Sequence, residues 1–136
     1  MILAEKIESL RRCVQRVEAR RPDTVEALRT DADAQDIVTL NLARAVQLCV
    51  DMAMHVIASM ERPAPQAMGE SFDRLADEGV ISAALARRMR SAVGFRNVAV
   101  HSYQTLDWAI VHSIAHRHLE DFRAFARSLD SYTENP

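Results

Sequence analysis

The sequence contains few of the residues that interrupt helices. Its 136 residues include three glycines and four prolines, and two of those prolines, Pro63 and Pro65, lie in the loop-like stretch Glu61–Ser71. Apolar and polar residues nowhere alternate for long enough to predict a β-strand, and no segment is repeated. These absences argue against sheet-containing and repeat architectures. The length suits one compact core, so we expect a single all-α domain over residues 1–136.

Excess charge, cysteine and long apolar runs are also scarce. The formal net charge is −2, from 17 Lys and Arg against 19 Asp and Glu, so a nucleic-acid site would have to be a local patch. The two cysteines, Cys13 and Cys49, have no neighbouring metal-type ligands, which is typical of small buried side chains. No run approaches the roughly 18 apolar residues of a membrane span. Because charges at Glu5, Lys6 and Glu8 also argue against a signal peptide, we expect a cytoplasmic protein with no membrane partner.

The spacing of apolar residues predicts four main helices. In the first, Leu3, Ile7, Leu10, Val14 and Val17 alternate by four and three residues and therefore share one face, and Pro22 ends or restarts this helix. The others are expected over about 33–62, 82–101 and 107–129, with a short helix opened by Ser71 and closed by Gly79. The sequence thus predicts an antiparallel, up-and-down four-helix bundle with one short extra helix.

The segment from Gly94 to Tyr103 carries the chemically informative residues. It contains Arg96, Asn97, His101 and Tyr103 in the pattern Arg-x4-His-x-Tyr, preceded by Gly94 and Phe95. This pattern resembles the signature of the HepT-like branch of the HEPN ribonucleases. The flanking residues 71–103 and the earlier segment RAVQLCVDMAMHVI, residues 44–57, are also similar to that branch. The resemblance covers roughly residues 33–107.

The resemblance implies a HEPN domain that acts as the toxin of a toxin–antitoxin system and as a metal-independent endoribonuclease. Arg96 would stabilise the scissile phosphate, and His101 would transfer protons. Asn97 would position one of these two side chains by hydrogen bonding. An imidazole, with an ordinary pKa of about 6.5, suits proton transfer near neutral pH, and a guanidinium fork suits phosphate oxygens. No metal or cofactor is expected, and the RNA target, tRNA or mRNA, stays open.

The resemblance also implies two protein partners. Tyr103 corresponds to the tyrosine that a cognate minimal nucleotidyltransferase antitoxin, of the MntA-like type, adenylylates. The other partner is a second copy of the chain. Residues five apart on a helix diverge by roughly 140°, so Arg96 and His101 do not share a face. Either the helix loosens near His101 or a second subunit completes the site; family members form dimers, and we predict a homodimer.

Three weaker patterns leave alternatives open. The basic residues Arg87, Arg88 and Arg90 precede the motif in a segment without acidic residues, which indicates either an RNA-binding track or a solvated face paired with acids elsewhere. Polar residues spaced by three and four in the second helix line either the catalytic cleft or the dimer seam, with Asp51 paired to His55, or else form a solvent face. They are Arg44, Gln47, Asp51 and His55.

The last helix carries His112, His116 and His118. A metal site there lacks a recognised ligand spacing, so exposed histidines on a polar face are favoured. The chain as a whole also has an alternative function of another class. In that alternative the chain would be a non-catalytic helical partner, or substrate-presenting subunit, of a nucleotidyltransferase.

Overall fold

All regular secondary structure in the residues described by the computed structural model, 2–134, is helical. The elements are α1 (Ile2–Arg20), α2 (Val25–Arg29), α3 (Ala32–Ser59), α4 (Met68–Asp77), α5 (Ala83–His101), the 3-10 helix η1 (Tyr103–Thr105), α6 (Trp108–Arg117) and α7 (Leu119–Glu134). Side chains are described through residue 132. The predicted all-α class is confirmed.

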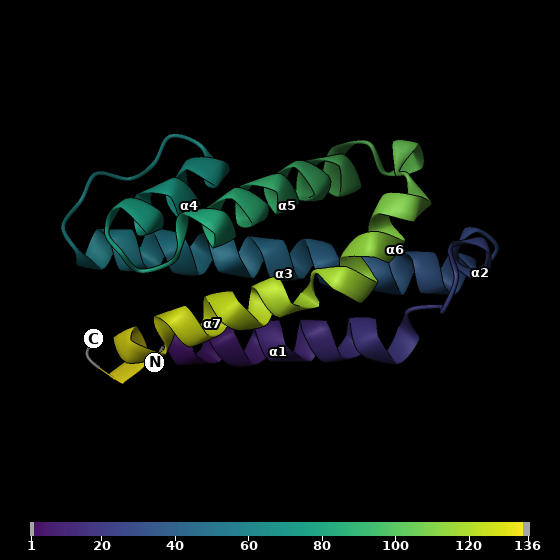
Figure 1. The fold of residues 1–136 in the computed structure, drawn as a ribbon, viewed down its shortest axis with the longest axis horizontal. Helices are drawn as coiled ribbons and strands as arrows, with labels where there is room; N and C mark the ends of the chain where they lie inside the picture. Colours follow the sequence, from purple (N-terminus) through teal and green to yellow (C-terminus); the bar gives the residue numbers. More distant parts are fainter. Residues whose placement is uncertain (1, 135–136) are drawn as a thin grey trace.

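The long helices alternate in direction along the long axis of the molecule. Figure 1 shows α1 and α5 running one way and α3 and α7 running the other way, with both chain ends at the same end of the bundle. The up-and-down topology therefore agrees with the prediction. The expectation of one short extra helix was wrong, because the described chain contains three short α-helices, α2, α4 and α6, in addition to η1.

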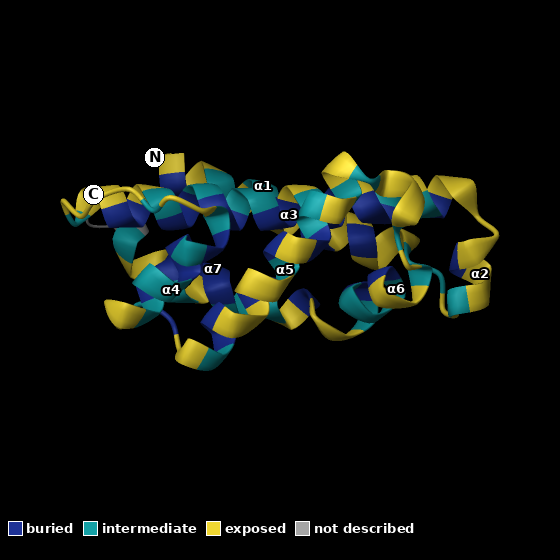
Figure 2. Cartoon of the chain, turned by 90° about the horizontal axis from the view of Figure 1, so that it is seen from above, coloured by how far each residue is buried: buried dark blue, intermediate teal, exposed yellow. Residues whose placement is uncertain are grey.

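Helix α3 lies at the centre of the bundle and packs against each of the other six α-helices. By length and composition it could cross a membrane, with a mean hydropathy of 1.4 over its most apolar window, but 56% of that window is buried inside the protein. In Figure 2 the buried positions lie along the sides of helices that face one another. Burial on several sides explains why α3 is apolar around most of its circumference.

Capping residues explain several helix boundaries. Ser82 and Asp107 accept backbone hydrogen bonds at the starts of α5 and α6, as predicted. Gly79, with a φ of 76°, follows α4 in the left-handed conformation that glycine adopts without steric cost. The predicted start of α4 was wrong: the helix begins at Met68, and Ser71 lies buried inside it with its hydroxyl donating to the Met68 carbonyl.

The predicted single C-terminal helix is divided into two. His118 ends α6 with φ −119° and ψ 6°, and α7 begins at the next residue. The division lets α6 pack against α2 while α7 packs against α1. No glycine or proline marks this bend, and the apolar spacing continues through it, so the two docking surfaces decide the break rather than local sequence.

Candidate active site

Helix α5 stays regular through the whole Arg-x4-His segment. It ends at His101, and the backbone N–H of Ser102 donates to the Val98 carbonyl at 2.8 Å. Of the two alternatives left open by the sequence, the one in which the helix loosens near His101 is therefore contradicted. On a regular helix Arg96 and His101 are separated by about 7.5 Å along the axis and by roughly 140° around it. One chain does not bring these two side chains together on one face.

Arg96 and Asn97 form a hydrogen-bonded pair. Arg96 Nη1 donates to Asn97 Oδ1 at 3.2 Å, and both residues are half-buried. His101 is exposed, and its ring makes no hydrogen bond or ion pair within the described residues. Of the three candidate catalytic residues, Arg96 and Asn97 thus contact each other, whereas the His101 imidazole stays open to an incoming group.

The exposed side of α5 near its C-terminal end carries Gly94, Asn97, Val98 and His101, which we call the α5 stripe. A Cβ atom built on Gly94 meets no atom within 4 Å, so packing within this chain does not require glycine there. Val98 and the neighbouring Val100 are exposed by 38% and 52%. An interior helix glycine costs roughly 0.5–1 kcal/mol relative to alanine, so its presence on an open, partly apolar surface favours close approach by another molecule.

Tyr103 lies just beyond α5, in η1, and is held by residues from two other helices. Its hydroxyl donates to Asp36 Oδ1 at 2.5 Å, and its ring meets the Trp108 ring edge to face, with centroids 5.9 Å apart. Partial burial and the Asp36 carboxylate raise the pKa of Tyr103 to about 12, while the Thr39 hydroxyl acts in the opposite direction. Asp36 and Thr39 were not predicted from the sequence, where 67 residues separate Asp36 from Tyr103.

The predicted basic track is mostly occupied by ion pairs. Arg88 pairs with Asp121 at 2.8 Å, and Arg90 pairs with Asp73 on α4. The Arg90 stem also lies over Gly69, where an added Cβ would come within 3.1 Å of it. Among the described residues Arg88 and Arg90 are thus paired with acidic side chains, and only Arg87 of the three has no acidic partner.

The polar residues of α3 do not form the predicted Asp51–His55 pair. Asp51 instead accepts a hydrogen bond from Gln47 at 2.9 Å and lies 3.8 Å from the Lys6 ammonium on α1. Arg44 and His55 are exposed. In the described part of the chain no hydrogen bond or ion pair joins these α3 residues to Arg96, Asn97 or His101. Asp51 contacts α1 and not the α5 motif.

The histidines of the last segment have structural contacts. The rings of His112 and His116 lie 4.2 Å apart, and their Nε2 atoms meet the carbonyls of Asp23 and Pro22 at 3.0 and 2.8 Å. They hold α6 against the α1–α2 connection, so the expectation that they are simply exposed was wrong for this pair. His118 lies 3.4 Å from Asp121. No group of three potential metal ligands occurs among the described residues.

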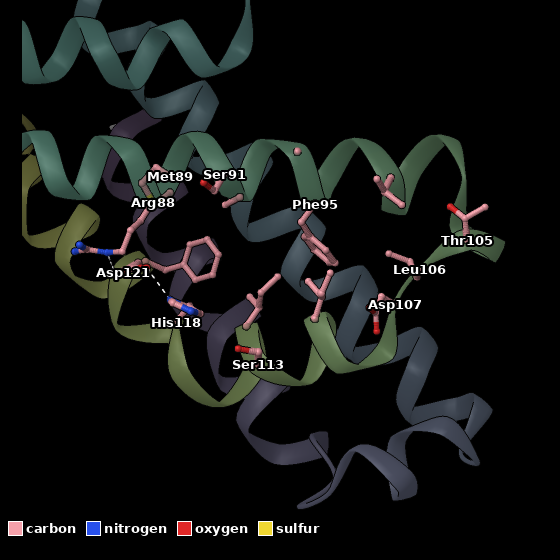
Figure 3. A pocket seen from close by; sticks show the side chains of 16 residues that line it. Arg88, Met89, Ser91, Phe95, Thr105, Leu106, Asp107, Ser113, His118 and Asp121 are labelled. Carbon is pink, nitrogen blue, oxygen red and sulfur yellow. Dashed lines mark hydrogen bonds and ion pairs between the residues drawn. The ribbon is translucent and has the colours of Figure 1, made fainter.

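A groove of about 670 Å³ separates α5 from α6 and α7. Figure 3 shows Phe95 in its middle, the Arg88–Asp121–His118 cluster at one end, and Thr105 and Asp107 at the other. Its walls are mainly apolar, and Arg96, Asn97 and His101 are absent from its lining. The groove therefore borders the motif helix without containing the motif.

The chain matches the Ribonuclease HepT-like family over residues 4–129. It belongs to that family. The predicted resemblance is confirmed, and the match extends well beyond the residues 33–107 from which it was inferred. The HepT-like chain is 36% identical over 124 residues to the mRNA nuclease HepT of Shewanella oneidensis, which covers 91% of this chain and 92% of the relative.

Several solved structures similar to this HepT-like chain come from toxin–antitoxin complexes. A toxin–antitoxin crystal structure with AMP-PNP matches at a TM-score of 0.90 and 34% identity, covering 96% of this chain and 98% of that one. A tri-AMPylated Shewanella oneidensis HEPN toxin in complex with its MNT antitoxin matches at 0.89 and 35%, covering 96% and 97%. A cytosolic Bacillus subtilis protein, YutE, matches at 0.79 but 14% identity and therefore shares the fold alone.

Proposed function

We propose that this HepT-like chain is the toxin of a toxin–antitoxin pair and that it cuts RNA, either mRNA or tRNA, in the cytoplasm. The observation that carries the proposal is the 36% identity to an mRNA nuclease across 91% of the chain. The intact set of Arg96, Asn97 and His101 on a regular α5 supports it. These are the groups that cleavage next to a ribose 2′-hydroxyl requires.

The proposed reaction is attack of the 2′-hydroxyl on the neighbouring phosphorus. His101 moves the proton, since its exposed ring can approach a substrate, and Arg96 stabilises the charge that grows on the phosphorane oxygens. Asn97 holds the Arg96 guanidinium through the 3.2 Å hydrogen bond. The bond between phosphorus and the 5′-oxygen breaks, and that oxygen receives the proton that left the 2′-hydroxyl. The products are a 2′,3′-cyclic phosphate and a free 5′-hydroxyl. An imidazole and a guanidinium suffice for these steps, so no metal or cofactor is required.

A homodimer supplies what one chain lacks. Arg96 and His101 point in directions roughly 140° apart on the regular helix, so one phosphate contacts both only when a second copy brings its own side chain. The α5 stripe suits such a contact: Gly94 leaves room for a neighbouring backbone, and exposed Val98 adds apolar area. In the proposed dimer two α5 helices pack along this stripe, so that Arg96 of one copy and His101 of the other act on one phosphodiester.

Binding of RNA also needs positive charge on the protein surface that contacts the RNA phosphates. Arg87 is exposed and unpaired among the described residues, whereas Arg88 and Arg90 are paired with Asp121 and Asp73. Exposed ion pairs contribute about 0–1 kcal/mol each, so phosphate groups can replace the carboxylates at small cost. We propose that all three arginines contribute to RNA binding, with Arg87 making the first contact.

The proposed partner is a minimal nucleotidyltransferase antitoxin that adenylylates Tyr103. The tri-AMPylated relative in complex with its MNT antitoxin supports this assignment. Tyr103 is 36% exposed and lies two residues beyond His101, so added phosphate groups would carry negative charge beside the motif. That charge would repel RNA and offer Arg96 a competing anion.

Cleavage of paired oligonucleotides tests the proposal. The purified chain should cut an RNA but spare the same oligonucleotide with a 2′-deoxy residue at the cut position. His101→Ala should abolish cutting and growth arrest, while His118→Ala, which removes a comparably exposed imidazole, should retain both. Cleavage of the 2′-deoxy substrate would contradict the mechanism. Growth arrest that persists in His101→Ala would favour the non-catalytic partner instead.

A further inference from the structure

The phenol oxygen of Tyr103 has a defined set of neighbours. It donates its proton to Asp36 Oδ1 at 2.5 Å. The Thr39 hydroxyl, one turn further along α3, lies close enough to influence the phenol, and Thr39 is only 2% exposed. That hydroxyl has no hydrogen-bonding partner in the described part of the chain. The edge contact with Trp108 fixes the ring, and the exposed side of the phenol stays open to an incoming group.

These surroundings pose a chemical problem for modification of Tyr103. Its pKa is raised to about 12 by partial burial and by the Asp36 carboxylate. At pH 7 the ionised fraction of such a phenol is about 10⁻⁵. A neutral phenol is a weak nucleophile toward phosphorus, so its proton must leave as the new bond forms. The atom in position to receive that proton is Asp36 Oδ1.

We propose that Asp36 is a catalytic residue in the adenylylation of its own chain, in which it accepts the Tyr103 proton while the phenol oxygen attacks the α-phosphorus of ATP. The bond between the tyrosine oxygen and the α-phosphorus forms, the bond from that phosphorus to the bridging oxygen of the β-phosphate breaks, and pyrophosphate leaves. The proton passes to the Asp36 carboxylate and then to water. The antitoxin binds the nucleotide; the toxin supplies nucleophile and base.

Thr39 has a positioning role in this scheme. A phenol oxygen has one proton and two lone pairs; the proton is directed to Asp36, and the Thr39 hydroxyl can occupy one lone pair. In this scheme the remaining lone pair is the one that attacks the α-phosphorus. Asp36 and Thr39 of α3 would together orient the acceptor for that attack.

The inference rests on the proposed function, because it takes Tyr103 as the acceptor. The test measures the initial rate of transfer from α-labelled ATP to the full chain by its partner nucleotidyltransferase, from pH 6 to pH 10. Asp36→Asn keeps an oxygen that can accept the hydrogen bond but removes the base. Asp33→Asn, on the same helix one turn earlier, removes the same charge without touching Tyr103 and is the matched control. Tyr103→Phe identifies the acceptor.

We expect Asp36→Asn to lower the rate at pH 7 by about 100-fold or more, the scale of general base catalysis, and Asp33→Asn to leave it within about twofold. The Asp36→Asn defect should shrink steadily toward pH 10, because the phenol then ionises without help. Asp36→Glu should restore part of the rate. Circular dichroism and thermal unfolding of each variant check that the fold is kept.

The possible failures are distinguishable. Labelling of wild type and Asp36→Asn at equal rates throughout would overturn the role of Asp36 while leaving the proposed function intact. A deficit of the same size at every pH would show that Asp36 only positions the ring and is not the base. Labelling that persists in Tyr103→Phe, or no labelling of the wild type, would instead contradict the adenylylation part of the proposed function.

Discussion

A mixture of two inactive variants should recover activity if the nuclease site is shared between two copies. Arg96→Ala removes the cation proposed to stabilise the phosphate, and His101→Ala removes the group proposed to transfer the proton. In a mixed dimer one site pairs the intact Arg96 of one chain with the intact His101 of the other, while the second site has neither. The mixture should therefore cut RNA although each variant alone does not.

The expected magnitude follows from the geometry of α5 and from random pairing. The helix is regular to His101, so the two side chains of one copy diverge by roughly 140° and would belong to different sites of the proposed dimer. If copies exchange freely, half of the dimers are mixed, and each has one of its two sites intact. The mixture should reach about a quarter of the wild-type rate at the same total chain concentration.

The assay is the initial rate of cleavage of a labelled RNA after the two variants have been unfolded together and refolded, or co-expressed. Co-purification through a tag on one variant verifies that mixed dimers form. The residual rate of each variant alone sets the baseline. A mixture that forms mixed dimers yet cuts no faster than that baseline would refute the shared-site reasoning, and Arg96 and His101 would then have to act separately.

Two further predictions concern stability. Because the folded state keeps the Tyr103 proton up to a pKa of about 12 and the unfolded chain loses it near 10, the contribution of this group is fully present below pH 10 and is lost as the pH rises toward 12. Urea unfolding should be measured from pH 8 to pH 11.5. Over this range the free energy of unfolding should fall by about 1 kcal/mol more in the wild type than in Tyr103→Phe, after allowance for solvent screening of a side chain that is 36% exposed. If the free energy of unfolding fell equally with pH in both proteins, the surroundings assigned to Tyr103 would be contradicted. His116→Ala, which leaves the Pro22 carbonyl unpaired, should lower the free energy of unfolding by about 1–2 kcal/mol, whereas His118→Ala should change it by less than about 0.5 kcal/mol. Equal effects of the two substitutions would argue against the docking role of His116.

The sequence by itself determined the helical class, the approximate boundaries of α1, α3 and α5, and the identity of the motif residues. These are local properties. Apolar spacing at three and four residues predicts a helix face, Ser82 and Asp107 are caps that act on neighbouring N–H groups, and the segment from Gly94 to Tyr103 is contiguous along the chain.

Only the tertiary structure decided which distant residues meet. The break at His118, the carbonyl partners of His112 and His116, and the acids that pair with Arg88 and Arg90 all depend on how helices dock. Asp36 is the clearest case. It is one of many acidic residues in the sequence, and its importance comes from the packing that places its carboxylate 2.5 Å from the Tyr103 hydroxyl. Periodicity reports which face of a helix is buried, but contacts between residues far apart in the chain arise from the packing of whole helices, which no local pattern specifies.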